Sequence, residues 1–284
     1  MEDFESQQPL RAYDNQEFLN SKEGRTIRIL SEYLYPDQYL KKNHIYNTIV
    51  LFGSARSFST KTWQKKVKEI EKNLVKQKDQ KKLAILEKEF SRMQRLQFTC
   101  KYYDETVELI KMLTNWTKTL PLNKKFYVCT GGGGGMMEAA NYGAYKTGSK
   151  NIGFNIQLPF EQHPNPYITP ELNFEFHYFF MRKFWFAYYA KAMIAMPGGF
   201  GTFDELFEIL TLQQTKILSK KVPIILYGSD FWNKTMNFEF LADIGMISYE
   251  DLELFHFSDS PEEAFEFLKV ELSELLFINN SSNE

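Results

Sequence analysis

Residues 126–141, FYVCTGGGGGMMEAAN, decide the fold, because an apolar run ends there at five consecutive glycines and a helix-forming run follows. The segment Phe126–Thr130 has the length and composition of a buried parallel strand. Without Cβ atoms in the turn, the backbone N–H groups before the next helix are free to face an anion. A tight turn with no ligand is the simpler interpretation of this stretch alone.

A second glycine-rich turn occupies residues 196–205, MPGGFGTFDE, after the apolar run Ala192–Met196 and before a helix predicted over Leu206–Leu218. Thr202 and Glu205 have the spacing of a capping box, which would give this pair a purely structural role. Two such turns nevertheless follow two strands of one predicted sheet, and ligands of open α/β sheets bind beyond the carboxyl ends of the strands. We expect both turns to face one crevice.

Further apolar segments alternate with helical ones along the chain. Thr48–Phe52 is the predicted first strand, and it ends in the turn Gly53-Ser54. The other predicted strands are Ile152–Ile156, Phe174–Tyr178 and Val222–Tyr227, in addition to the two that precede the glycine turns. Strands alternating with helices predict an α/β fold, a Rossmann-like doubly wound parallel sheet flanked by helices.

The chain divides into a core domain and peripheral segments. We predict an N-terminal helical arm over residues 1–42, a Rossmann-like domain over 43–278 and a polar tail over 279–284. Residues 60–96 form a charged helical insertion, because apolar residues recur there at helical spacing among many Lys, Glu and Gln. Such a protruding helical hairpin is either a solvated pair of helices or a dedicated interaction arm.

Composition limits the classes of function. The net charge of -2 gives no overall attraction to nucleic acid, and acids are interleaved with the lysines of residues 61–101, so we expect no nucleic-acid partner. The two cysteines and four scattered histidines have no metal-ligand spacing, so we expect no metal. The acidic, polar start of the chain and the lack of a run of roughly 20 apolar residues predict a cytoplasmic protein with no membrane partner.

Several enzyme classes are disfavoured by their missing motifs. The five-glycine turn lacks the Gly-Lys-Ser/Thr ending of a P-loop, and Met136 stands where a dinucleotide fingerprint has its third glycine. No Gly-x-Ser-x-Gly elbow is present, and no lysine is singled out for a Schiff base with pyridoxal phosphate.

Four segments in order resemble the LOG family, whose members were long described as lysine decarboxylases. They are residues 131–141, Pro159–Gln162, Arg182-Lys183 and Pro197–Glu205, and the resemblance covers about residues 45 to 230. It implies a phosphoribohydrolase that releases a free base and ribose 5-phosphate from a nucleoside 5'-monophosphate, either AMP or a cytokinin riboside monophosphate, without cofactor or metal. It also implies a homodimer, for which the aromatic stretch 179–189 is a candidate interface.

The resemblance assigns roles to individual residues. Glu205 and Arg182 correspond to the family's catalytic pair. The substrate- and phosphate-binding residues implied by the resemblance are Gly53, Ser54, Gly132, Gly133, Glu138, Lys183, Gly198, Gly199, Gly201 and Thr202. The charged insertion and the N-terminal arm depart from the shortest members of the family.

The chemistry of the residues agrees with this assignment. Breaking an N-glycosidic bond generates an oxocarbenium-like sugar, so a carboxylate such as Glu205 is needed to stabilise the cation and position water. Arg182 could hold the phosphate or assist the leaving base. The alternative for Lys183, and to a lesser degree for Arg182, is a surface charge at a helix turn. The alternative to an enzyme is a carrier that binds a nucleotide or molybdenum cofactor without chemistry, which would have no need of Glu205.

Overall fold

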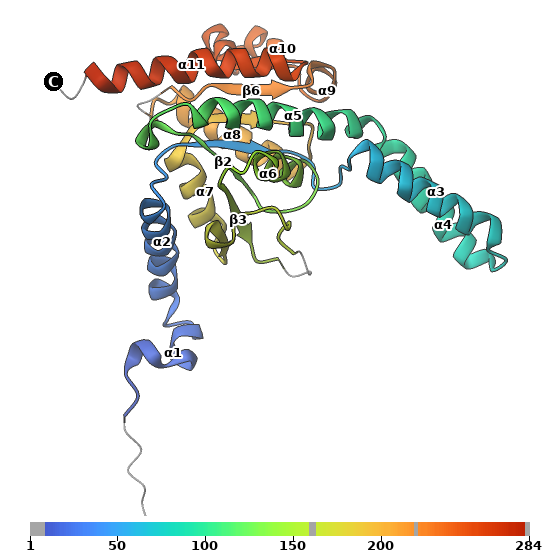
Figure 1. Cartoon of the computed structure of the whole chain (residues 1–284), viewed down its shortest axis with the longest axis horizontal. Helices are drawn as coiled ribbons and strands as arrows, with labels where there is room; N and C mark the ends of the chain where they lie inside the picture. Colours follow the sequence, from blue (N-terminus) through green and yellow to red (C-terminus); the bar gives the residue numbers. More distant parts are fainter. Residues whose placement is uncertain (1–8, 159–162, 219–220, 282–284) are drawn as a thin grey trace, which may run out of the picture.

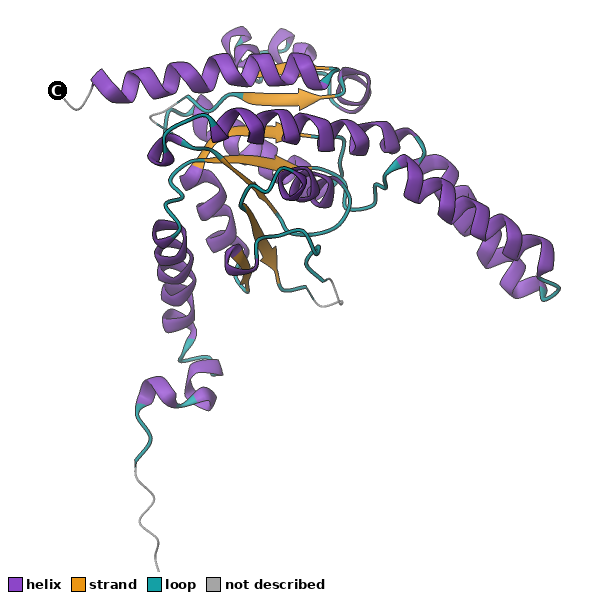
Figure 2. Cartoon of the chain, viewed as in Figure 1, coloured by secondary structure: helices purple, strands orange, loops and turns teal. Residues whose placement is uncertain are grey.

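The computed structural model describes residues 9–158, 163–218 and 221–281, and its centre is a single sheet of seven parallel strands (Figures 1 and 2). The strand order is β4-β3-β2-β1-β5-β6-β7. The strands are β1 Thr48–Phe52, β2 Tyr127–Thr130, β3 Asn151–Ile156, β4 Asn173–Phe176, β5 Ala190–Ala195, β6 Ile224–Tyr227 and β7 Phe255–Ser258. This confirms the predicted doubly wound α/β fold, to which the sheet adds β7, a strand that the sequence analysis did not predict.

Helices cover both faces of the sheet. The helices α5 (Phe98–Lys118), α6 (Met136–Lys146) and α11 (Pro261–Ser281) pack on one face, where they share an apolar core with the strands. The other face is covered by α2 (Arg25–Lys42), α7 (Phe179–Tyr189), α8 (Phe200–Gln214), α9 (Ser229–Thr235) and α10 (Phe238–Asp243). The short α1 (Gln16–Asn20) precedes α2.

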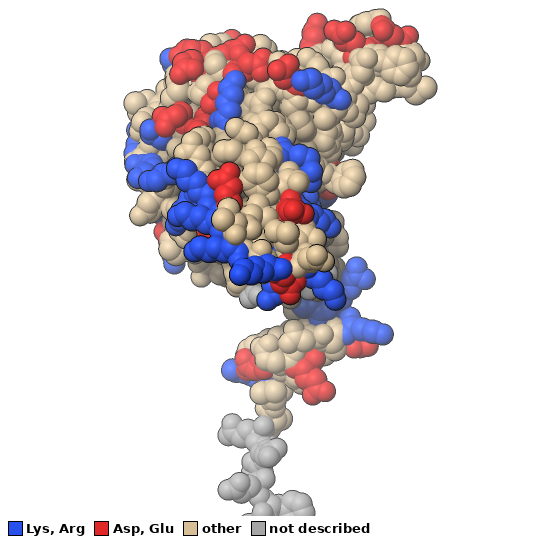
Figure 3. All heavy atoms as spheres, turned by 90° about the vertical axis from the view of Figure 1, so that its right-hand side faces the viewer, with Lys and Arg blue, Asp and Glu red and all other residues tan. Residues whose placement is uncertain are grey.

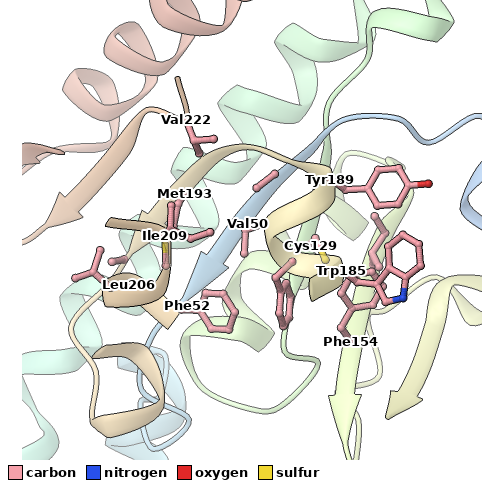
Figure 4. Close-up of a cluster of buried hydrophobic side chains, with 14 of the residues drawn as sticks. Val50, Phe52, Cys129, Phe154, Trp185, Tyr189, Met193, Leu206, Ile209 and Val222 are labelled. Carbon is pink, nitrogen blue, oxygen red and sulfur yellow. The ribbon is translucent and has the colours of Figure 1, made fainter. Parts of the chain in front are cut away.

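The central strand β1 serves both cores, because alternate residues of a strand point to opposite faces. Ile49 and Leu51 contribute to the core beneath α5 and α6. Val50 and Phe52 contribute to the opposite core, where Figure 4 shows them on the same side as Ile209 of α8. A strand buried on both faces therefore appears in the sequence as the continuous apolar run of residues 48–52.

The sheet changes winding direction between β1 and β5. From β1 the chain proceeds outward through β2, β3 and β4, and it returns through α7 to place β5 on the other side of β1. In doubly wound sheets, the crevice at such a switch point binds ligands. The turns after β1 and β5 therefore border the crevice where a ligand is expected.

Two helical segments lie at the periphery. Helices α3 (Thr60–Lys76) and α4 (Gln80–Leu96) form a hairpin that projects from the body (Figure 1). Helix α2 is attached to α7 by two hydrogen bonds: the Trp185 indole donates to the Glu32 carbonyl at 2.9 Å, and the Tyr189 hydroxyl donates to Asp37 at 2.8 Å. The packed part of the N-terminal arm is thus fixed to the domain.

Some predicted segments fall wholly or partly outside the residues that the structure describes. Residues 1–8, the motif Pro159–Gln162 and residues 282–284 lie outside the described residues, and α11 runs through Ser281 into the segment predicted as a polar tail. Cys100 and Cys129 are both buried free thiols. Among the described residues, no helix is both long enough and apolar enough to cross a bilayer.

Candidate active site

The turns after β1 and β5 are joined directly by the backbone. The Ser54 N–H donates to the Pro197 carbonyl at 3.0 Å, and the Met136 N–H at the start of α6 donates to the Ser54 carbonyl at 3.0 Å. Gly53 permits this approach, because a Cβ there would lie 2.6 Å from Cβ of Met136 and 2.8 Å from Cβ of Met196. The glycine turns thus lie together at the carboxyl end of the sheet.

The helix after the second turn begins earlier than predicted. Instead of Leu206–Leu218, α8 spans Phe200–Gln214 and its N-cap is Gly199, with no side-chain cap. The capping-box interpretation of Thr202 and Glu205 is therefore wrong, because both residues lie within the helix. Thr202 and Glu205 are three positions apart, so they share one side of α8 near its N-terminus.

A cleft of ≈ 910 Å³ opens above these turns. Seven predicted site residues line it: Gly53, Ser54, Arg182, Gly198, Gly199, Gly201 and Thr202. Residues at or beyond the carboxyl ends of β2, β3 and β6 complete the lining, including Gly131, Ile156 and Phe231. The volume falls in the usual range for small-molecule sites.

Arg182 supplies a cation to the cleft from α7. Its side chain is only 12% exposed, and its guanidinium lies over the rings of Phe179 and Phe186. One guanidinium nitrogen, Nη2, lies 3.4 Å from Oε1 of Glu205, whereas the buried Nε has no hydrogen-bond partner in the part of the chain that the structure describes. A buried donor without a partner is costly, so a movement of this side chain that gave Nε an acceptor would be favourable.

Glu205 lies deeper than the cleft. Its side chain is 4% exposed and borders a small void of ≈ 10 Å³ beside Val50 and Phe52 rather than the cleft itself. Burial raises its pKa to about 7, although Lys183 and Arg182 oppose that shift. A carboxyl group with this pKa exchanges a proton near neutral pH, as a general acid or base requires.

Lys183, next to Arg182, points away from the cleft. Its Nζ lies 2.9 Å from carboxylate oxygens of both Asp204 and Glu208, and 3.9 Å from Glu205. Burial lowers the Lys183 pKa, but the hydrogen bonds to Asp204 and Glu208 outweigh it, so the pKa is raised overall. Lys183 therefore forms part of a charge network behind the site and is not a simple surface charge.

Gly132, Gly133 and Glu138 do not line the cleft. The Asn165 side-chain amide donates to the carbonyls of Gly132 and Gly133 at 3.1 and 3.0 Å, and Glu138 accepts a hydrogen bond from Tyr103 at 3.0 Å. Asn165 also donates to Asn141 at 2.8 Å, within a buried polar network. These hydrogen bonds hold the five-glycine turn on the side away from the cleft. Of the five glycines, Gly131 lines the cleft.

The base of the helical hairpin contributes to the cleft as well. Leu96, Phe98 and Thr99, at the junction of α4 and α5, line it together with Arg56. The sequence analysis missed these residues, although the apolar Leu96 and Phe98 at the end of a charged segment were the available signal. Among the described residues, no three or more His, Cys, Asp or Glu side chains are grouped so that they could hold a metal ion.

Comparisons with known proteins place this geometry in context. Residues 137–268 match the family model described as "possible lysine decarboxylase". The chain has no match among curated proteins. It is similar in structure to the structural-genomics protein TM1055, with 19% identity, a TM-score of 0.43 and coverage of 78% of this chain and 98% of the other.

Two further solved structures are similar at comparable levels. One is the molybdenum cofactor carrier protein of Chlamydomonas reinhardtii, with 16% identity, a TM-score of 0.45 and coverage of 80% of this chain and 98% of the other. The second is the molybdenum cofactor binding protein of the phototrophic bacterium Rippkaea orientalis, with 20% identity, a TM-score of 0.41 and coverage of 58% and 87%.

Proposed function

We propose that this protein hydrolyses the N-glycosidic bond of a nucleoside 5'-monophosphate, a proposal supported by the family-model match over residues 137–268. The products are a free purine-type base and ribose 5-phosphate. The observation that carries the proposal is the ion pair between Arg182 and Glu205, 3.4 Å long, beside two glycine turns at the switch point of the sheet. This arrangement places an anion-binding surface next to a carboxyl group whose pKa is about 7.

The phosphate is assigned to the N-terminus of α8. Gly199, Phe200 and Gly201 line the cleft there, and no side chain caps the first turn, so its N–H groups and the positive end of the helix dipole favour an anion. The Thr202 hydroxyl lies over Gly198 in the same turn, where it adds a donor. Arg182 lines the same cleft, and its buried Nε has no hydrogen-bond partner among the described residues.

Glu205 is assigned to the sugar. In the proposed reaction a water molecule attacks C1' of the ribose, the C–N bond breaks, and its electron pair and a proton pass to the leaving base. Glu205 takes the proton from the water and stabilises the positive charge on the sugar. Because Arg182 lies on the cleft side of the pair, its guanidinium must turn toward the phosphate for the carboxylate to reach the substrate.

The base is assigned to the apolar part of the cleft. Phe98, Phe179 and Phe200 line it and are 55%, 48% and 96% exposed, so their rings are available for stacking on a purine. Ile156 and Leu158 extend the apolar lining. These residues come from four separate segments. Turnover of a panel of nucleoside 5'-monophosphates would identify the preferred base.

A variant of Glu205 separates an enzyme from a carrier of a nucleotide or molybdenum cofactor. AMP binding is measured by calorimetry and turnover by base release for the wild-type protein and for Glu205→Ala. An enzyme retains binding and loses turnover in the variant. Unchanged binding, with no turnover in either protein, supports the carrier and contradicts the proposal.

We further propose that the protein acts as a homodimer through α7. Phe180, Phe184 and Tyr188 are 49%, 38% and 56% exposed along one side of this helix, and they border a groove of ≈ 590 Å³ with Leu212 and Leu218. An exposed apolar patch of this kind is typical of an interface. Light scattering should give a dimer mass, and Phe180→Glu with Tyr188→Glu should give a monomer; a monomeric wild-type protein would contradict this.

A further inference from the structure

The hairpin of α3 and α4 carries a charge opposite to that of the rest of the protein. Residues 60–96 contain twelve Lys and Arg but five Asp and Glu, an excess of seven positive charges in a chain whose net charge is -2. The remainder of the chain is therefore strongly acidic. Figure 3 looks toward the side from which the hairpin projects, and Lys and Arg gather over the middle and lower part of that face.

The positive charges of the hairpin are exposed, and Lys66 also lies over the ring of Phe58. All twelve side chains are in exposed positions, and within the described part of the chain no ion pair involves residues 60–96. The nearest ion pair along the sequence joins Lys101 to Glu105 at 3.6 Å, beyond the end of α4. The hairpin thus presents its cations to solvent instead of neutralising them internally.

Helical geometry separates the acids that are interleaved in the sequence. At 100° per residue, Lys61, Lys65, Lys68, Lys72 and Lys76 fall in one stripe along α3, about 22 Å long, with Glu69 and Glu71 at its borders. Helix α4 carries a similar stripe of Lys81, Lys88, Arg92 and Arg95. Successive cations are therefore about 4.5–6 Å apart along α3, and along α4 the spacing is similar except for a gap of about 10 Å between Lys81 and Lys88.

The stripes are not needed to hold the hairpin together. Val67 and Ile70 of α3 and Met93 of α4 form a small apolar core with Trp63 and Phe90 between the helices. The Trp63 indole donates to the Met93 carbonyl at 2.7 Å. Removing lysines from the outer faces should leave this core unchanged.

Contrary to the expectation from the overall composition, we propose that the α3–α4 hairpin binds the phosphate backbone of a nucleic acid. Rows of cations a few Å apart are complementary to a nucleic-acid strand, which carries one negative phosphate per nucleotide. A helix that lies on a membrane presents an apolar face to the lipid. Here the apolar faces of α3 and α4 pack against each other, and exposed apolar side chains such as Val75 and Ile85 occur only near the tip.

The test is the salt dependence of binding of a labelled 20-nucleotide single-stranded RNA to the full chain, followed by fluorescence anisotropy. The test variant is Lys65→Gln, Lys68→Gln and Lys72→Gln. A matched control removes the same charge from exposed positions outside the hairpin, by Lys22→Gln, Lys146→Gln and Lys234→Gln. This readout does not depend on the proposed hydrolase activity.

The wild-type protein and the control should bind the RNA with an affinity that falls as salt is raised. The hairpin variant should bind at least tenfold more weakly at low salt. Its slope of log K against log salt should be smaller by about 2, because three phosphate contacts are lost at about 0.7 each. Equal loss in variant and control, no binding at low salt, or binding only to vesicles containing phosphatidylserine would each overturn the proposal.

Discussion

Arg182 lines the cleft and donates a hydrogen bond to Glu205, which lies deeper and is almost completely buried. The guanidinium thus lies between the cleft and the Glu205 carboxyl group. Burial of this pair explains why the pKa of Glu205 is raised and that of Arg182 is lowered.

Replacing Glu205 by Gln should remove catalysis without removing binding. The amide keeps the size of the side chain but accepts no proton, so kcat should fall by at least about 100-fold. The affinity for AMP should change by less than about threefold, because the phosphate site at α8 is intact. A variant that retains kcat within a factor of ten would show that Glu205 is not the base.

The wild-type protein should show a pH dependence that the Glu205→Gln variant lacks. Since the raised pKa of Glu205 is about 7, the ionised base forms as pH rises through that value, and kcat/KM should increase and then level off. The folded state also holds this proton more tightly than the unfolded chain. The free energy of unfolding should therefore decrease between about pH 4.5 and 7 in the wild type and be flatter in the variant.

Arg182→Ala should affect both substrate binding and turnover. It removes the cation from the cleft and leaves the Glu205 carboxyl without that partner, so KM should rise and kcat/KM should fall by at least about 100-fold. Lys183→Gln is the matched control, because Lys183 is also within 4.0 Å of Glu205 but does not line the cleft. An equal loss of kcat/KM in the two variants would contradict a specific role of Arg182 in the cleft, because any positive charge near Glu205 would then be sufficient.

Two alanine substitutions distinguish space needed by the fold from space needed by a ligand. A Cβ at Gly198 would lie 2.1 Å from the Thr202 hydroxyl, so Gly198→Ala should lower both thermal stability and activity. A Cβ at Gly201 meets nothing within 4 Å, so Gly201→Ala should keep the melting temperature and weaken AMP binding. Unchanged binding in Gly201→Ala would place the phosphate elsewhere.

Asn165 should be essential for the shape of the five-glycine turn. Asn165→Ala leaves the buried Gly133 carbonyl without its side-chain donor, whereas the Gly132 carbonyl keeps the bond from the Asn165 backbone N–H at 2.8 Å, so the free energy of unfolding should fall by about 1–3 kcal/mol. Asn165→Asp is the control that keeps the size but loses the donor, and it should be destabilised as well. Denaturation of both variants measures the effect, and wild-type stability in either would argue against this role.

Much of the architecture could be predicted because it is encoded locally. The apolar runs that end in Gly53 and Gly131 are sufficient to indicate buried parallel strands followed by tight turns, and the sheet confirms them. Strand β7 was missed because it is a short, partly buried edge strand, Phe255–Ser258, with no long apolar run. The start of α8 was placed too late because Gly199 and Gly201 have low helix propensity, whereas tertiary packing sets the helix start.

The burial of the site residues could not be predicted from the sequence. Whether Glu205 faces the cleft or the core depends on how α7 packs against α8, and no local pattern reports that. The same holds for Asn165, whose partners are 24 to 33 positions away in the sequence. The cation stripes of the hairpin, by contrast, follow from helical periodicity once the bounds of α3 are known.

The most direct measurement is the analysis of products after purified protein is incubated with AMP, with adenine and ribose 5-phosphate quantified separately. The proposed chemistry requires the two products to appear in equal amounts in the wild type, with at least 100-fold slower release by Glu205→Gln. Absence of both products at high protein concentration, across a panel of nucleoside 5'-monophosphates, would contradict it.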